Sequence, residues 1–285
     1  MAAVEAHMLP RRLALAEAAI LPRALSETAP REPVARDRKL RVGVDLGTAY
    51  LVLVVLDEEG WPLAGEWQAA EVARDGLVVD FIGATDRLRG MKQRVQDRLG
   101  RELTHAASGY PPGVPRVEVR ATAHVLEAAG LECSGMIDEP SAANNVLQLQ
   151  EGAIVDVGGG TTGIAVVEGG RIVLSADEPT GGRHFSLVIA GGLNISLEEA
   201  EALKLTESEQ PRLLPSVRPV MEKVGSIILR HTREHHVDAL TLVGGGAAFY
   251  GMAEVVQNYT GLPTRVVDPP LFVTPVGLAL HDPAQ

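Results

Sequence analysis

Apolar residues in this chain gather in short runs separated by glycine-bearing turns. Two such regions, 41–69 and 153–177, predict strand hairpins rich in Val, Leu and Ile. Elsewhere, apolar residues recur at helical spacing. Val217, Val220, Met221, Val224, Ile227 and Ile228 predict a long helix over 217–236.

Helices and strands alternate between and after the two hairpins. We expect a short strand and an amphipathic helix over 73–100, and a helix then a strand over 116–140. A helix should follow and be closed by Gly152. Residues 181–205 predict two helices with a glycine break between them, and 239–259 predict a strand, a glycine loop and a helix. The order indicates an α/β protein.

The two hairpin regions resemble each other. When Asp45 is aligned with Asp156, "VGVDLGTAYLVLVV" lies on "AIVDVGGGTTGIAVV". A repeat about a hundred residues apart predicts two halves of like fold, with a ligand cleft between them. We expect lobe I over 41–140 with a return of about 266–285, and lobe II over 141–265. Chance likeness between two Val- and Gly-rich strands is the alternative.

Charge and cysteine content restrict the partners. The net charge is −11, and residues 42–285 carry 18 Lys and Arg against 32 Asp and Glu. So acidic a body disfavours nucleic acid and anionic membranes as partners. Cys133 is the only cysteine, which rules out an internal disulfide and fits a reducing cytoplasm. Residues 1–40 read as an amphipathic helix and a polar linker, either a loose extension or a docking helix.

Each hairpin combines a glycine turn with one Asp, and this combination suits a phosphate ligand. Glycine lets ligand oxygens reach backbone N–H groups, and Thr hydroxyls add donors. An Asp beside phosphate makes sense when it holds a hard cation, so Asp45 and Asp156 are candidate Mg²⁺ residues, acting through water. "VGGGAA", 243–248, gives a third glycine loop, between a strand and a helix.

Five ordered motifs resemble the actin-like ATPase superfamily, which is shared by actins, sugar kinases and DnaK-type chaperones. They are "VDLGTAYLVLVV", "DEPSAANNV", "VDVGGGTTGIAVV", "LVGGGAAFYGM" and "PVGLAL", and they span residues 41 to about 280. The resemblance implies an α/β, actin-like (ribonuclease H-like) ATPase fold, with two similar lobes around a cleft that binds ATP and Mg²⁺.

The resemblance also implies roles for individual residues. Glu139 matches the carboxylate that orients the attacking water, beside Asp45 and Asp156 as catalytic and Mg²⁺-positioning residues. The nucleotide-binding matches are Gly47, Thr48, Gly158, Gly159, Gly160, Thr161, Thr162, Gly181, Gly182, Glu201, Lys204, Gly244, Gly245 and Gly246. Of these, Glu201 and Lys204 match a pair that grips the nucleoside.

Several positions depart from the family pattern. No lysine matches the one near the γ-phosphate in DnaK-type chaperones, although Arg74 and Lys92 are nearby cations. Arg183 and His184 replace acidic residues after the glycine pair, and Asn144 and Asn145 replace small apolar residues. We therefore expect ATP binding, with slow hydrolysis.

"RDGLVVDFIGA", "HAASGYPPG" and "DEPSAANNVLQLQ" resemble a chaperone-like bacterial family encoded with the ethanolamine microcompartment system. That implies a cytoplasmic nucleotide-driven switch acting on a protein client or an ethanolamine-pathway enzyme, with or near a microcompartment. The alternatives are a filament-forming ATPase, a reactivating factor for the cobalamin-dependent lyase, and a small-molecule kinase. His231, His235 and His236 could bind metal, but a solvated helix end is the simpler interpretation.

Overall fold

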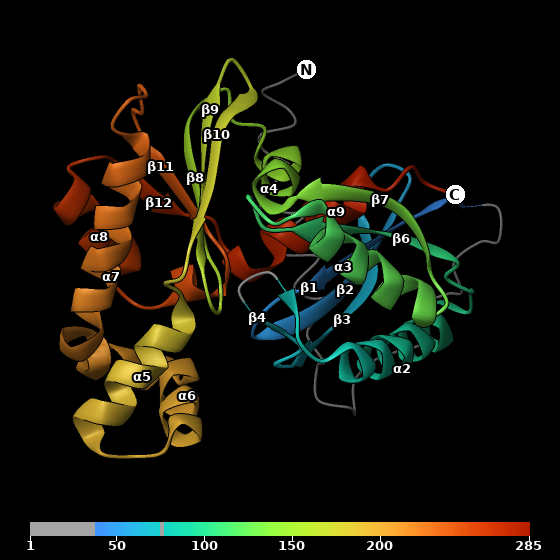
Figure 1. Cartoon of the computed structure of the whole chain (residues 1–285), viewed down its shortest axis with the longest axis horizontal. Coiled ribbons are helices and arrows are strands. Elements are labelled where there is room, and N and C mark those ends of the chain that lie inside the picture. The colour runs from blue at the N-terminus through green and yellow to red at the C-terminus, as the bar shows by residue number, and fades with distance from the viewer. Residues whose placement is uncertain (1–37, 75–76) are drawn as a thin grey trace. The chain divides into compact units, whose positions relative to one another are not determined.

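The computed structural model describes residues 38–74 and 77–285. The predicted N-terminal helix and most of the linker after it lie outside these residues. Contacts divide the chain into two compact units, labelled by element in Figure 1. Unit 1 extends to Gln148 and includes Phe272–Gln285, and unit 2 is Leu149–Leu271. No helix among the described residues is long and apolar enough to cross a membrane.

Unit 1 is built on one five-stranded sheet, with a small two-stranded ribbon beside it. Its elements are β1 (Leu40–Leu46), β2 (Tyr50–Asp57), β3 (Pro62–Ala69), β4 (Ala73–Arg74), β5 (Leu77–Val78), α2 (Phe81–Leu99), β6 (His105–Tyr110), α3 (Arg116–Ala128), β7 (Glu132–Asp138), α4 (Glu139–Leu147) and α9 (Val273–His281).

Unit 2 is built on a second five-stranded sheet. Its elements are β8 (Glu151–Val157), β9 (Thr162–Glu168), β10 (Arg171–Glu178), α5 (Gly182–Leu193), α6 (Leu197–Leu205), α7 (Gln210–Thr232), β11 (Leu240–Val243), α8 (Met252–Thr260) and β12 (Thr264–Val266). Short 3₁₀ turns occupy Glu207–Glu209 and Gly245–Ala248, and a third, Pro270–Phe272, precedes α9.

The two sheets have the same topology, as the sequence repeat predicts. The strand orders are β3-β2-β1-β6-β7 and β10-β9-β8-β11-β12. In each sheet three antiparallel strands are followed by two strands that run parallel to the central one. Asp45 and Asp156 each occupy the last position but one of the central strand. The predicted α/β fold with two similar halves is therefore confirmed.

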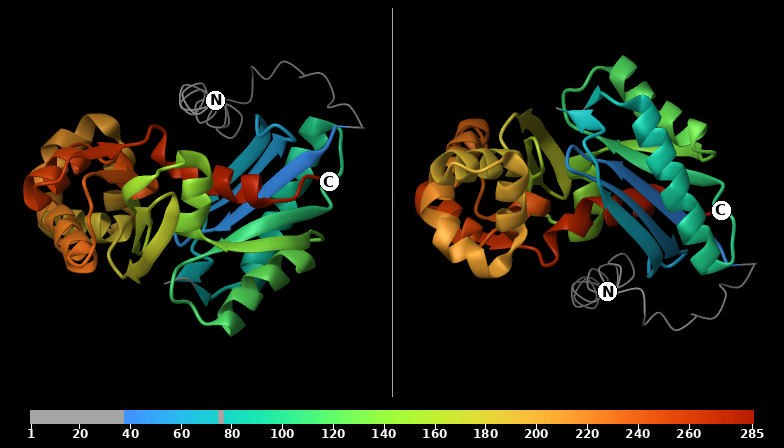
Figure 2. Two further views of the ribbon diagram at one scale, coloured as in Figure 1. Left: turned by 90° about the horizontal axis from the view of Figure 1, so that it is seen from above. Right: turned by 90° about the horizontal axis from the view of Figure 1, so that it is seen from below.

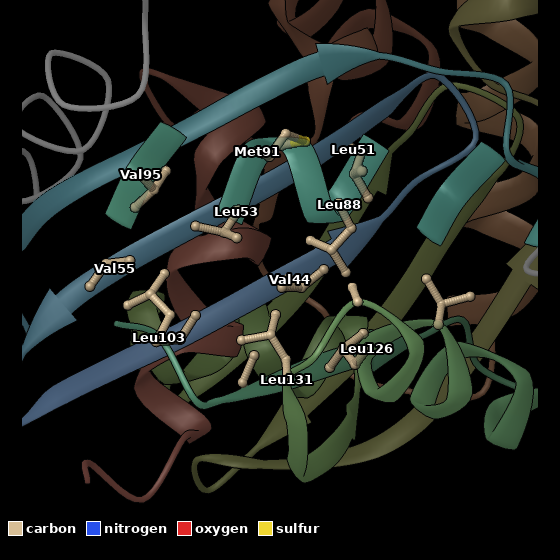
Figure 3. Packing of buried hydrophobic residues seen from close by; sticks show 14 of the residues in the cluster. Val44, Leu51, Leu53, Val55, Leu88, Met91, Val95, Leu103, Leu126 and Leu131 are labelled. Atoms are coloured by element: carbon tan, nitrogen blue, oxygen red, sulfur yellow. The ribbon is translucent and has the colours of Figure 1, made fainter. Parts of the chain in front are cut away.

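Each unit has its own apolar core. In unit 1, alternate residues of β1 and β2 face Leu88, Met91 and Val95 of α2, all fully buried (Figure 3). In unit 2, α5, α7 and α8 pack against β8, β9 and β11. Two cores of this kind follow from the sequence because strand alternation and helical periodicity each place one apolar face inward.

Helix α9 lies against the other face of the unit 1 sheet, across β1 and β2 (Figure 2). It packs closely because two glycines remove side chains from its contacts. A Cβ atom at Gly43 would lie 2.7 Å from the Pro275 carbonyl, and one at Gly277 would overlap the backbone of Ala142 in α4. This packing groups the whole of α4 with unit 1, whereas the predicted boundary between the lobes, at 140/141, falls inside this helix.

Several predicted helix boundaries are wrong. The helix before β8 ends at Leu147 with Gln148 in the left-handed conformation, and Gly152 lies inside β8. The expected break at Gly191 and Gly192 lies within α5, which ends at Leu193 with Asn194 as its C-cap. Helix α7 begins at Gln210 rather than 217, because its internal prolines are on the exposed side where water can bond the freed carbonyls.

A buried ion pair holds the end of α9 to the sheet. Asp282 is fully buried, and its carboxylate lies 2.9 Å from Nε2 of His105 and accepts a 2.8 Å hydrogen bond from the Val42 amide. Ser134 also donates to this carboxylate. The Asp282 carboxylate raises the pKa of His105, while burial opposes the shift. Protonated His105 therefore stabilises the folded state.

The His105–Asp282 pair should make the stability of the protein depend on pH. Folded His105 binds its proton more tightly than an unfolded histidine of pKa 6.5, so its contribution is complete below that pH. The contribution is lost as pH rises through the higher folded pKa. In thermal unfolding from pH 5.5 to 9, His105→Gln should lower Tm most at acidic pH. His124→Gln, at an exposed histidine, is the control. A pH-independent difference between wild type and His105→Gln would contradict this account.

Candidate functional site

The second glycine hairpin and the start of α5 form one hydrogen-bonded structure in unit 2. The amides of Gly182 and Arg183 donate to the carbonyls of Gly158 and Gly159, at 2.8 and 2.7 Å. The Gly158 amide closes the turn on Thr161 at 3.0 Å. Helix N-termini have unpaired N–H groups, and here two of them fix the shape of the hairpin.

This arrangement changes the roles of two predicted residues. The Thr162 hydroxyl is buried and donates to the Thr180 carbonyl at 2.5 Å, so in this conformation it is not a phosphate donor. A Cβ at Gly181 would lie 2.7 Å from the Gly158 carbonyl, so that glycine is required by packing. The Gly181 amide donates to Nδ1 of His184 at 3.2 Å, so this histidine takes a capping role.

The hairpin still offers backbone donors. Within the described ranges, we find no hydrogen bond to another residue from the amides of Gly159, Gly160 or Thr161. Successive loop amides of this kind can form an anion-binding concavity. Gly159, Gly160 and Thr161 therefore stay candidates for phosphate contact through their amides, whereas the Gly158 amide is used within the turn.

Asp156 lies next to this hairpin with a second carboxylate nearby. The strand register aligns Asp156 with Gly163 and Gly163 with Asp177. A Cβ at Gly163 would lie 3.8 Å from Cβ of Asp156 and 3.7 Å from Oδ1 of Asp177. The side chains of Asp156 and Asp177 therefore both lie close to Gly163, a position without a side chain. Sequence reasoning missed Asp177, although its place in the third strand of a predicted hairpin region was available as a signal.

The oxygen donors near Gly163 suit a hard cation that is bound partly by the protein and partly by phosphate oxygens and water. Among residues 38–74 and 77–285, no three His, Cys, Asp or Glu side chains form a ready-made metal site. Mg²⁺ is commonly bound by one or two carboxylates together with water and phosphate oxygens. Asp156 and Asp177 provide oxygen ligands of that kind, so the residues present fit Mg²⁺.

The predicted nucleoside pair comes together on α6. Lys204 Nζ lies 2.7 Å from the Glu201 carboxylate and donates to the Gly182 carbonyl at 3.2 Å. The buried hydroxyl of Ser186 donates to Glu201 at 2.5 Å. The lysine side chain is 14% exposed and that of Glu201 is 37% exposed, so the pair is partly accessible.

The third glycine loop abuts the same hairpin. A Cβ at Gly246 would lie 2.8 Å from the Val157 carbonyl, and Gly244 has a φ of 84° and packs against Asp156. The Gly244 amide donates to the Pro270 carbonyl at 2.9 Å. A Cβ at Gly245 would approach Leu271 at 3.3 Å. Packing explains these glycines, and contact with a base stays a prediction.

Gly182 is where the predicted segments meet. A Cβ placed there would lie 3.5 Å from the Gly158 carbonyl, 3.6 Å from Lys204 Nζ and 3.9 Å from Cα of Gly246. The hairpin, α5, α6 and the glycine loop are up to about ninety residues apart in sequence. Unit 2 therefore brings its whole predicted set of nucleotide-binding residues into one place.

In unit 1, the predicted residues share one end of the sheet. β1, β6 and β7 run parallel, so Asp45, near the end of β1, and Glu139, just after β7, lie at the same edge. Gly47 and Thr48 form the turn between β1 and β2. A Cβ at Gly109 of β6 would lie 3.2 Å from Cγ of Glu139, so this glycine gives the glutamate room.

Glu139 is not the cap of α4. The side chain of Asp138 takes that role and accepts the Ser141 amide at 3.0 Å. This removes the simplest structural explanation for Glu139, whose catalytic role stays a prediction. Asn145, which replaces a small apolar residue of the family pattern, lies 3.5 Å from the Gly277 carbonyl, so its side-chain amide contacts α9.

Other sequence candidates have structural roles. His231 pairs with Glu178 at 2.8 Å and His235 with Glu168 at 3.3 Å, so these histidines do not converge on a metal. Hydrogen bonding from His231 and the Arg230 charge lower the pKa of Glu178. Lys92 donates to the Gly130 carbonyl at 2.6 Å.

Cys133 and the predicted cation Arg74 complete the sequence-based comparison. Burial raises the pKa of Cys133, which disfavours a nucleophilic thiolate. The side chain of Arg74 lies outside the described set.

The paired sheet topology, with an Asp before a glycine turn in each unit, defines the actin-like ATPase fold. The chain matches two family models of this class, the cell division protein FtsA over residues 153–277 and the MreB/Mbl protein over 62–193. The crystal structure of MreB5 of Spiroplasma citri bound to AMPPNP matches with a TM-score of 0.70 at 17% identity, over 86% of this chain and 96% of that chain.

A much higher similarity identifies the family. The chain is 43% identical over 249 residues to the ethanolamine utilization protein EutJ of Escherichia coli (strain K12), over 87% of each protein. The crystal structure of EutJ from Carboxydothermus hydrogenoformans matches with a TM-score of 0.88 at 42% identity, over 97% of this chain and 99% of that chain. The chain belongs to the EutJ family.

A methyl group at Gly158 should separate ligand binding from folding. In the protein a Cβ there would approach only the Thr161 carbonyl, at an ordinary 3.4 Å. Gly158→Ala should therefore keep Tm within a few degrees but weaken ATP binding by about tenfold or more, because the methyl group crowds the loop amides. Gly181→Ala should instead destabilise the fold, since its Cβ overlaps the hairpin backbone. Unchanged ATP affinity in a folded Gly158→Ala protein would contradict a phosphate role for this turn.

Proposed function

We propose that this chain is an Mg²⁺–ATP-binding protein of ethanolamine utilisation. The observation that carries the proposal is the meeting of four predicted segments around Gly182. The similarity to EutJ proteins supports the pathway, and the fold shared with an AMPPNP-bound MreB5 supports a nucleotide ligand. The protein would work in the cytoplasm, in or beside a bacterial microcompartment.

Different residues of the chain would bind the phosphates, the nucleoside and the cation. The amides of Gly159, Gly160 and Thr161 would contact phosphate oxygens, and Lys204 and Glu201 would contact the nucleoside. Asp156, with Asp177 across Gly163, would hold the cation and its water in unit 2, and Asp45 stays a predicted Mg²⁺ residue of unit 1. Mg²⁺ would neutralise phosphate charge, which an acidic protein otherwise repels.

Glu139 would orient the water that attacks the terminal phosphate. Phosphoryl transfer to water depends mainly on positioning and electrostatic stabilisation, so one well-placed carboxylate can be enough. Among the side chains that the structure describes, no cation is assigned to the γ-phosphate, and Lys92 donates to the Gly130 carbonyl. Hydrolysis should therefore be slow.

Nucleotide occupancy would act as a conformational switch on a protein client, in the manner of a chaperone-like ATPase. Such a switch requires only that nucleotide binds the two states of the protein with different affinity. The client would be an enzyme or another protein of the ethanolamine pathway, and pull-down from cells grown on ethanolamine would identify it.

Binding of ATP is the direct test of the proposal. Calorimetry should show Mg²⁺-dependent ATP binding by the wild-type chain at millimolar nucleotide or below. Asp156→Asn should abolish the gain in affinity that Mg²⁺ provides, because a cation ligand is lost. Asp97→Asn, at an exposed carboxylate of α2 that accepts a hydrogen bond from Gln93, is the matched control. Failure of the wild-type chain to bind ATP would refute the proposal.

Turnover tests the role of Glu139 separately from binding. Glu139→Gln should leave ATP affinity within about twofold and lower phosphate release by about a hundredfold, because an amide cannot accept a proton from water. Glu127→Gln, at an exposed carboxylate paired with His124, should change neither quantity. Equal turnover in wild type and Glu139→Gln would return Glu139 to a structural role.

A further inference from the structure

Gln210, the first residue of α7, bonds to both sides of the predicted nucleoside subsite. Its Nε2 donates to the Lys204 carbonyl at 2.9 Å, and its Oε1 accepts the Tyr250 amide at 2.8 Å. No motif in the sequence marks this residue. The two bonds join segments that are otherwise forty residues apart or more along the chain.

The two bonded segments carry the predicted nucleoside contacts. Lys204 lies in the last turn of α6, where backbone carbonyls have no helical partner, and the same residue pairs with Glu201. Tyr250 follows the turn Gly245–Ala248, which forms the third glycine loop. The amide of Gln210 therefore spans the distance between α6 and that loop.

Few side chains could make this bridge. A primary amide provides a donor and an acceptor at one tip, and both are used here. Glutamate would lose the donor to Lys204, and asparagine is one methylene shorter. The ring contact between Phe185 and Phe249, 5.6 Å between centroids, anchors the loop to α5 rather than to α6.

The phosphate side of the site does not depend on this bridge. The hairpin is held by α5 through the amides of Gly182 and Arg183, with no contribution from Gln210. A change at Gln210 should therefore disturb the nucleoside subsite and leave the hairpin intact.

We propose that Gln210 is a positioning residue that fixes the spacing of the nucleoside subsite and so sets affinity for the nucleoside part of the ligand. This inference rests on the proposed ATP binding and deepens it. Gln210 acts through Lys204 and the loop, and it does not itself contact the ligand.

The test compares ligands with and without a nucleoside. Binding of ATP, ADP and inorganic tripolyphosphate, each with Mg²⁺, is measured by calorimetry for the full chain. Gln210→Ala should weaken ATP and ADP by about tenfold, from the loss of two hydrogen bonds, and leave tripolyphosphate within about twofold. Gln210→Glu keeps the acceptor for the Tyr250 amide, so its affinities for ATP and ADP should fall between those of wild type and Gln210→Ala. Gln257→Ala is the matched control, since Gln257 bonds the Thr264 amide at 3.1 Å and joins α8 to β12.

The outcomes separate this inference from the proposed function. If the wild-type chain binds no ATP, the proposed function fails and the inference fails with it. If ATP binds wild type and Gln210→Ala equally, only the inference is overturned. If ATP and tripolyphosphate weaken equally in a variant that melts like Gln257→Ala, Gln210 supports the whole unit and the spacing role is wrong.

Discussion

The contact between the start of α5 and the hairpin carbonyls of Gly158 and Gly159 is the constraint on which unit 2 depends. It uses N–H groups that every helix leaves unpaired and so needs no side chain. For the contact to form, the backbones must approach closely, and Gly181 makes that possible. The same approach brings Lys204 and Gly246 to Gly182, so the site is assembled by backbone packing.

In unit 1, close backbone approaches also position a predicted site residue, but they involve α9 rather than a hairpin. There the close approaches are between α9 and β1 at Gly43 and between α9 and α4 at Gly277. The end of α9 is then fixed by the buried carboxylate of Asp282. These contacts set the position of α4 and therefore of Glu139. The position of Glu139, which is expected to orient water, thus depends on contacts of α9 and Asp282 near the C-terminus.

Much of the fold could be predicted because local signals agree with the tertiary structure. An Asp followed by a glycine turn between apolar strands is a short pattern, and its repetition at Asp45 and Asp156 indicated two like halves. Helix ends were less predictable. Gly191 and Gly192 suggested a break, but buried neighbours such as Ile189 keep α5 helical through them. Tertiary packing overrides a weak propensity of this size.

The parts of the site and of its supporting structure that sequence reasoning missed are those made by long-range contacts. Gln210, Asp177 and Asp282 are ordinary polar residues in sequence, and no motif marks them. Their importance depends on which backbone amides and carboxylates come near once the chain is folded. Thr162 shows the reverse case, because its motif suggested a phosphate donor while the fold assigns its hydroxyl to Thr180. A motif therefore locates a site well, but the role of each residue in the site depends on which hydrogen-bonding groups are already paired in the folded protein.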